Sequence, residues 1–164
     1  MVIITYDKGG KALSQASGFF ISSEGDVITN RHVLQGAIKA EIKTTKGNTY
    51  LVKLVVAEDI QGDIIRVSVD IPRGVTIPLR LSSSLPEEGE RIIVIGNPLG
   101  LEQTISDGIV SAVRDIPRYG KIVQITAPIS PGSSGSPVRP QTEVCFPSTS
   151  WPESSSPSSA SRSA

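Results

Sequence analysis

The sequence predicts an all-β protein, folded as a sandwich or as barrels. Short runs of strand-forming residues recur along the chain and are separated by residues that favour turns. No stretch keeps the apolar period of 3.6 residues that an amphipathic helix would show over three turns. Since 38% of the 164 residues are hydrophobic and 20% are charged, the chain can bury a real core, as one domain or as two small subdomains that share a cleft.

Six strands are expected in the N-terminal part of the chain. The tripeptide Lys46-Gly47-Asn48 predicts a hairpin, because a three-residue link that contains glycine suits a tight reversal between antiparallel strands. A turn at residues 23–26 precedes the third strand, and His32 follows that strand in a short connection. The six expected strands are residues 2–5, 15–21, 27–30, 38–45, 49–57 and 63–69.

A second set of strands is expected after residues 71–78, where three turn formers predict a boundary between two barrels. Within this set, residues 91–95 are rich in β-branched side chains and end in a glycine-flanked turn. The expected strands are a weak edge strand at 77–81, followed by 91–95, 103–105, 109–113 and 121–127.

Composition and charge argue against several classes of partner and site. Sixteen basic and sixteen acidic residues cancel without forming runs, so neither nucleic acid nor an anionic membrane is an expected partner. The one cysteine, Cys145, cannot form an internal disulfide, and no Cys/His cluster has metal-ligand spacing, so we expect no metal and no cofactor. The N-terminal residues lack the features of a secretory signal, and no run of about eighteen apolar residues predicts a membrane span.

One loop and two upstream residues are candidates for nucleophilic catalysis. Residues 131–137, PGSSGSP, present serine hydroxyls in a backbone too rich in glycine for a regular element. A serine needs a base that takes its proton and a third group that orients the base. The single histidine, His32, lies after a strand-like run, and Asp63 begins another. The chain order His, Asp, Ser is that of the chymotrypsin-like arrangement.

From about residue 15 to Val138 the sequence resembles the trypsin-like serine proteases of the HtrA/Deg type. Six segments match that family's motifs in order and spacing, which is a specific signal, whereas any one segment alone would be a weak one. The six segments are 16–21 (ASGFFI), 29–33 (TNRHV), 63–67 (DIIRV), 96–100 (GNPLG), 108–111 (GIVS) and 130–137 (SPGSSGSP).

The resemblance implies two antiparallel β-barrels of the chymotrypsin/trypsin-like fold. We expect the first barrel in residues 1–72, carrying His32 and Asp63, and an incomplete second barrel in residues 73–138, carrying Ser134. Residues 139–164 hold nine serines and four prolines, which supply little apolar surface to offset chain entropy, so a disordered tail is expected there.

The resemblance also implies the roles of the candidate residues. Ser134 is the expected nucleophile because the family pattern Gly-x-Ser-Gly-x-Pro fits the loop only in that register. His32 would be the base, Asp63 would orient it, and the N–H groups of Gly132 and Ser134 would form the oxyanion hole. From the residues alone other interpretations stay open: Asp63 could cap a turn, Asp59 could be the acid, and the three loop serines could be turn residues.

Substrate, assembly and compartment are implied by the resemblance alone. It suggests unfolded or misfolded polypeptides as substrates, with Pro128 and Ile129 near a pocket for small or medium apolar side chains. Relatives often form homo-oligomers and mostly work outside the cytoplasm. Without a signal sequence, the chain is expected either to lack an N-terminal segment or to be an atypical cytoplasmic member.

The chain departs from the family pattern at several positions. Arg31 stands where a small or amide residue is more usual, and Ser133 and Ser136 replace Asn and Gly. After Val138 the expected strand pattern stops, which suggests an out-of-frame or otherwise replaced C-terminus, or a serine-rich linker; the coding sequence after codon 138 would decide between them. The sequence therefore leaves three functions open: a serine endopeptidase, an inactive relative with an unclosed second barrel, and a non-catalytic peptide-binding scaffold.

Overall fold

The computed structural model describes residues 1–97, 104–117 and 120–141. Strands make up nearly all the regular structure in these ranges, and one short 3-10 helix, η1 (Arg31–Leu34), joins β4 to β5. The strands are β1 (Val2–Tyr6), β2 (Ala12–Ser17), β3 (Phe19–Phe20), β4 (Asp26–Asn30), β5 (Lys39–Lys43), β6 (Thr49–Asp59), β7 (Ile64–Val69), β8 (Arg91–Gly96), β9 (Thr104–Ile116), β10 (Gly120–Ile125) and β11 (Val138–Pro140).

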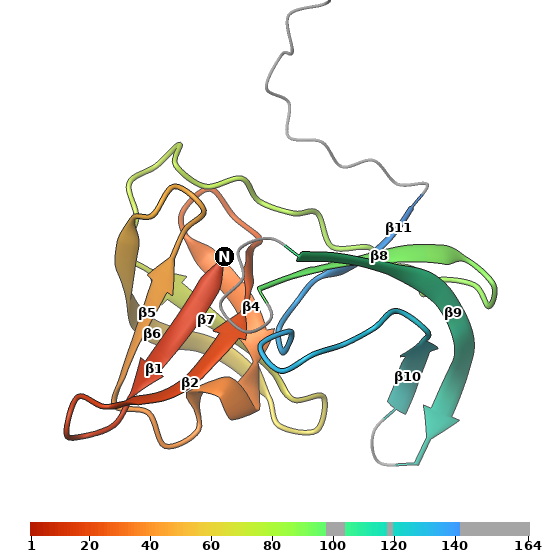
Figure 1. The fold of residues 1–164 in the computed structure, drawn as a ribbon, viewed down its shortest axis with the longest axis horizontal. Coiled ribbons are helices and arrows are strands. Elements are labelled where there is room, and N and C mark those ends of the chain that lie inside the picture. Colours follow the sequence, from red (N-terminus) through yellow and green to blue (C-terminus); the bar gives the residue numbers. More distant parts are fainter. Residues whose placement is uncertain (98–103, 118–119, 142–164) are drawn as a thin grey trace, which may run out of the picture.

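The first seven strands form one antiparallel sheet in the order β2-β1-β5-β6-β7-β4-β3. The end strands β2 and β3 are separated in the chain only by Gly18, so the sheet curls into a nearly closed barrel (Figure 1). Gly18 suits this corner because a Cβ there would lie 2.7 Å from Cδ1 of Ile3. The predicted hairpin at residues 46–48 is confirmed, since it joins β5 to β6 and Gly47 adopts a φ of 83°.

Alternation of side chains along the strands gives this barrel its core. In β4 the buried residues are Val27 and Thr29, two positions apart, as expected for a strand with one face turned inward. Ile3, Ile42 and Val67 are fully buried. Burial of each such side chain stabilises the fold by up to about 1.5–3 kcal/mol, so the barrel can serve as a rigid support for the residues at its rim.

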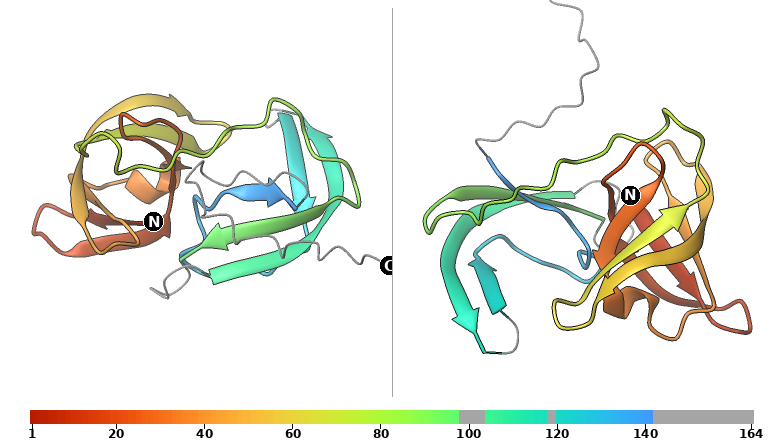
Figure 2. Two further views of the ribbon diagram at one scale, coloured as in Figure 1. Left: turned by 90° about the horizontal axis from the view of Figure 1, so that it is seen from above. Right: turned by 180° about the vertical axis from the view of Figure 1, so that it is seen from behind.

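The remaining four strands form a second antiparallel sheet in the order β10-β9-β8-β11. This sheet curves as an open trough beside the barrel (Figure 2). Its core is smaller and consists of the buried residues Ile92, Val94, Val110 and Ala127. The expected fold class, an all-β protein with one barrel and an incomplete second one, is therefore confirmed in the described residues; the division at residues 72 and 73 stays a prediction.

Several of the expected strands were wrong in detail. The strand expected at residues 15–21 is interrupted at Gly18 and forms parts of β2 and β3. Residues 77–81 form no strand, although the N–H of Leu79 donates to the carbonyl of Phe20 and so ties this stretch to the barrel.

The strand expected at 109–113 is the middle of the longer strand β9, and the one expected at 103–105 contributes its first residues, with residue 103 outside the described range. Arg139 and Pro140 were assigned to the disordered tail, but they belong to β11 and pair with β8. The predicted tail from residue 142 onward lies outside the described residues. The described ranges contain no helix of the length and hydropathy needed to cross a bilayer.

Candidate active site

Pairing between β4 and β7 brings His32 and Asp63 together. In this antiparallel pair Asn30, the last residue of β4, lies opposite Ile64, the first residue of β7. His32 follows on η1 and Asp63 immediately precedes β7, so both side chains lie at the same end of the barrel. Asp63 has a φ of 52°, in the left-handed region that Asp tolerates better than most residues.

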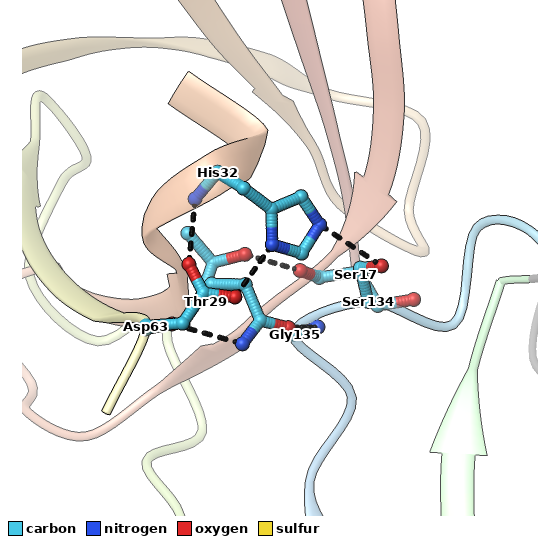
Figure 3. A network of polar contacts seen from close by, with 7 residues as sticks. Ser17, Thr29, His32, Asp63, Ser134 and Gly135 are labelled. Carbon is cyan, nitrogen blue, oxygen red and sulfur yellow. Dashed lines mark hydrogen bonds and ion pairs between the residues drawn. The ribbon is translucent and has the colours of Figure 1, made fainter. Parts of the chain in front are cut away.

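The Asp63 carboxylate holds both the main chain and the ring of His32. The His32 N–H donates to Oδ1 of Asp63 at 2.9 Å, and Nδ1 of the ring lies 2.6 Å from Oδ2 (Figure 3). Because an ionised carboxylate can only accept, Nδ1 carries the proton of the neutral imidazole and Nε2 is left as the acceptor.

Hydrogen bonding sets the ionisation of this carboxylate. Partial desolvation alone would raise the pKa of Asp63, but the hydrogen bonds from the His32 ring and N–H, together with the charge of the ring when protonated, hold the pKa below its ordinary value. Asp63 is therefore ionised at neutral pH, so it remains an acceptor for Nδ1–H.

Ser134 reaches the histidine from the second half of the chain. It lies in the loop of residues 126–137, which connects β10 to β11 and approaches the rim of the barrel (Figure 1). Its Oγ lies 3.3 Å from Nε2 of His32, on the opposite side of the ring from Asp63 (Figure 3). The structure thus brings together the three residues that the sequence singled out, and it does not bring Asp59 to the ring, since Asp59 instead accepts from the N–H groups of Gln61 and Gly62.

Ser17, at the end of β2, fixes the loop that carries Ser134. The Ser17 N–H donates to the carbonyl of Ser134 at 2.8 Å, and its hydroxyl donates to the carbonyl of Gly132 at 2.8 Å. The same hydroxyl accepts from the N–H of Asn97 at 2.9 Å. Ser17 is 1% exposed, so these bonds are shielded from water and hold the loop against the barrel.

Sequence reasoning missed Ser17, Thr29 and Asn30 as residues of the site. Thr29 donates through Oγ1 to the carbonyl of Ser17, and the Asn30 carboxamide contacts the main chain of Gly135 and Asp63. The only signal for them was their place in the two segments 16–21 and 29–33, where each could be interpreted as an ordinary strand residue.

The conformation of the loop suits an anion-binding turn. Gly132 and Gly135 adopt φ values of 95° and 78°, which favour glycine. The carbonyls of Gly132 and Ser134 are engaged by Ser17, and among the described residues no hydrogen bond is found for the N–H groups of Gly132 and Ser134. These are the two N–H groups expected in the oxyanion hole, and that assignment stays a prediction.

The two other loop serines differ in their surroundings. Ser133 donates through its N–H to the carbonyl of Ser130, which closes a turn. The Oγ of Ser136 is buried without a hydrogen-bond partner and packs against Gly96, where any Cβ would overlap it. Neither hydroxyl has a hydrogen bond to the histidine ring among the described contacts, which favours Ser134 as the reactive hydroxyl.

Pro128 and Ile129, the residues expected near a substrate pocket, lie exposed on the stretch that leads from β10 into the loop. Ile129 is 65% exposed, so its side chain is available for an apolar contact, and its role stays a prediction. Among the described residues no group of three or more His, Cys, Asp and Glu side chains is arranged to hold a metal ion.

Comparison with known proteins gives a consistent result. A family model described as a trypsin-like peptidase domain matches residues 16–143. A putative serine protease, HhoB, from Synechocystis sp. is 37% identical over 129 residues, which are 74% of this chain and 30% of that protein. A probable periplasmic serine endoprotease of the DegP-like type from Pseudomonas fluorescens is 34% identical over 137 residues, which are 80% of this chain and 28% of that protein.

Solved structures agree with the sequence comparison. A serine endoprotease from Yersinia pestis superposes with a TM-score of 0.70 at 26% identity, covering 85% of this chain and 49% of that one. An HtrA-type protease with a tripeptide superposes with a TM-score of 0.72 at 27% identity, covering 85% of this chain and 46% of that one. The chain thus spans about 30% of the length of the curated relatives and about half of the similar structures.

Proposed function

This chain belongs to the trypsin-like peptidase family, of the HtrA/Deg type, and we propose that it hydrolyses peptide bonds as a serine endopeptidase. The observation that carries the proposal is the continuous set of contacts from Asp63 through His32 to Ser134, with 2.6 Å at Nδ1 and 3.3 Å at Nε2. These residues lie on segments that connect strands of the two different sheets, so their convergence depends on both halves of the fold.

The first step is acylation. Nε2 of His32 takes the proton of Ser134 as Oγ attacks the carbonyl carbon of the peptide, forming the C–O bond of a tetrahedral intermediate. Asp63 accepts from Nδ1–H throughout, which keeps Nε2 as the base and stabilises the imidazolium that forms. The separation of 3.3 Å is a loose contact that substrate binding would tighten.

The intermediate then collapses with loss of the amine. The C–N bond breaks, and the proton held at Nε2 of His32 passes to the leaving nitrogen. An acyl group remains on Oγ of Ser134. Water then attacks this ester, with His32 again taking and returning one proton, so that the acid product leaves and the serine hydroxyl is restored.

The N–H groups of Gly132 and Ser134 would stabilise the oxyanion in both steps. Removing one such donor from a serine protease typically lowers the rate by about 100- to 1,000-fold. The positive φ of Gly132 supports this assignment, and so does the lack of any hydrogen bond to these two N–H groups among the described residues.

Polypeptides are the proposed substrates, in particular unfolded or misfolded chains. An extended peptide would lie between the barrel that carries the base and acid and the sheet that carries the nucleophile. In this proposal residues 1–72 and 73–138 act as the two halves of one catalytic unit. Assembly into a homo-oligomer is proposed from the family alone.

The second candidate function is a non-catalytic relative that keeps the three residues without turnover. The openness of the second sheet in the described residues favours it. Four described strands enclose a small core, and Ile92, Val123 and Ile125 are among the residues that line a groove on it. An open sheet has unpaired edges and a half-covered core, which lowers stability around the nucleophile loop.

Cleavage of an unfolded, fluorescein-labelled casein tests the proposal. The wild-type chain is expected to release internal peptides, and Ser134→Ala and His32→Ala are expected to abolish their release. Ser133→Ala serves as the matched control, because it removes a neighbouring hydroxyl for which the described residues show no hydrogen bond to the ring. Release of the same peptides by Ser134→Ala, or none by folded wild-type protein, would contradict the proposed peptidase function.

A further inference from the structure

Asn30 is the last residue of β4 and its carboxamide joins two parts of the site. Oδ1 accepts from the N–H of Gly135 at 2.6 Å, and Nδ2 donates to the carbonyl of Asp63 at 2.9 Å. The orientation of the amide is fixed by these partners, since a main-chain N–H requires the carbonyl oxygen and a main-chain carbonyl requires the amino group. Both the oxygen and the nitrogen of the Asn30 carboxamide are therefore hydrogen-bonded.

The two partners lie next to the reacting groups. Gly135 follows Ser134 directly in the chain, so its N–H belongs to the peptide group that joins Ser134 to Gly135. Asp63 contacts His32 through its side chain and Asn30 through its carbonyl. The contact with Gly135 spans 105 positions of sequence and joins the barrel to the loop of the second half.

We propose that Asn30 is a positioning residue that sets the distance between Ser134 and His32 by tying the nucleophile loop and Asp63 to the same side chain. This inference rests on the proposed peptidase function. Asn30 does not touch Oγ of Ser134 or the ring of His32 in any described hydrogen bond, so its effect would pass through the main chain on either side of them.

The other described support of the loop acts on carbonyls. Ser17 binds the carbonyl of Gly132 and the carbonyl of Ser134, and the latter belongs to the same peptide group as the Gly135 N–H. Only the Asn30 carboxamide takes the N–H of that peptide among the described contacts. Without it this peptide is held only at its carbonyl, by the Ser17 N–H, and a displacement of about 1 Å at a reacting atom costs about 100-fold in rate.

Two variants separate the effects of the two hydrogen bonds that the Asn30 side chain makes. Asn30→Ala removes both hydrogen bonds. Asn30→Asp keeps an acceptor for Gly135 and the volume of the side chain, but it removes the donor to Asp63. Asn48→Ala is the matched control, because Asn48 lies exposed in the β5–β6 hairpin and, among the described contacts, its hydrogen bonds are made by its main-chain carbonyl.

Two readouts are needed, one of which does not depend on activity. The first is the rate at which a fluorophosphonate labels the protein, together with kcat and KM on a peptide substrate. The second is the hydrogen-exchange protection of the Gly135 amide, measured by ¹⁵N NMR. Asn30→Ala is expected to lower labelling and kcat by about 10- to 100-fold with KM nearly unchanged, and to lower the Gly135 protection by about tenfold or more.

Asn30→Asp is expected to retain the Gly135 protection and still to label more slowly than wild type, and Asn48→Ala should match wild type in both readouts. Unchanged Gly135 protection in Asn30→Ala, or wild-type labelling in a folded Asn30 variant, overturns the positioning role. If Asn30→Ala does not fold, labelling of Asn30→Asp at the wild-type rate also overturns the positioning role. A wild-type chain that is never labelled instead overturns the peptidase function itself, and with it any catalytic role for Asn30.

Discussion

Asp63 binds His32 twice, through the ring at 2.6 Å and through the main-chain N–H at 2.9 Å. The first contact selects the tautomer of the imidazole, and the second fixes the start of η1, from which the ring projects. Orientation and proton location are therefore controlled by the same carboxylate.

Asp63→Asn is expected to abolish most activity without unfolding the protein. The amide can keep the shape of the carboxylate and the left-handed φ of 52°, but its NH₂ group would favour the tautomer in which Nε2 carries the proton. We expect kcat to fall by about 10⁴-fold, as for the same exchange in other serine proteases. Asp70→Asn, which alters an exposed ion pair with Lys53, is the matched control and should keep the wild-type kcat.

The lowered pKa of Asp63 predicts a small loss of stability in acid. Since this pKa is lower in the folded than in the unfolded chain, the unfolded chain binds more protons between the two values and stability falls with falling pH. The contribution is complete above the ordinary pKa of about 4 and is lost as the pH falls through the folded-state value.

Because 42% of the side chain is exposed, screening limits this contribution to a fraction of a kcal/mol. Melting temperatures of wild type and Asp63→Asn between about pH 6 and pH 3 would measure it. The advantage of the wild type should shrink on acidification, and an advantage that grows would show that the sign is wrong.

Gly135→Ala is expected to destabilise the protein more than a matched glycine exchange. Gly135 has a φ of 78°, and a Cβ there would overlap the carbonyl oxygen of Ser17 and Oγ1 of Thr29. Gly36→Ala is the control, because Gly36 has a φ of 76° with no atom near its Cβ position. We expect about 1–2 kcal/mol for the control and more for Gly135→Ala, measured by urea unfolding; equal losses would mean that the loop does not press against the barrel.

Two buried serine hydroxyls of the site should respond in opposite ways to substitution by alanine. Ser17→Ala leaves the carbonyl of Gly132 and the N–H of Asn97 without their partner and should cost about 1–3 kcal/mol of unfolding free energy. Ser136→Ala removes an Oγ that has no partner, so stability should be unchanged or slightly higher. A marked loss in Ser136→Ala would show that its hydroxyl is bonded in solution.

Local sequence patterns predicted the barrel well because its strands alternate between buried and exposed residues. Val27 and Thr29 in β4 are an example, and the hairpin at residues 46–48 follows from turn chemistry alone. The second half was harder to predict. The continuity of β9 through Gly108 and the pairing of β11 with β8 depend on contacts between distant segments, and β11 ends in a proline that favours a strand terminus or an edge.

Sequence motifs predicted only part of the candidate site. His32, Asp63 and Ser134 stand in segments that match family motifs, so the known order of the three residue types could pick them out. Ser17 and Asn30 are ordinary polar residues at strand ends. Their bonds to Gly132 and Gly135 span 115 and 105 positions, and no local pattern carries information about such contacts.

Covalent labelling with a fluorophosphonate, followed by mapping of the modified peptide, tests the central claim most directly. The account predicts one adduct, on Ser134, that is absent from Ser134→Ala and His32→Ala and present in Ser136→Ala. An adduct on a different serine, labelling that survives loss of His32, or no labelling of a folded wild-type sample would contradict the proposal that Asp63, His32 and Ser134 form a working nucleophilic site.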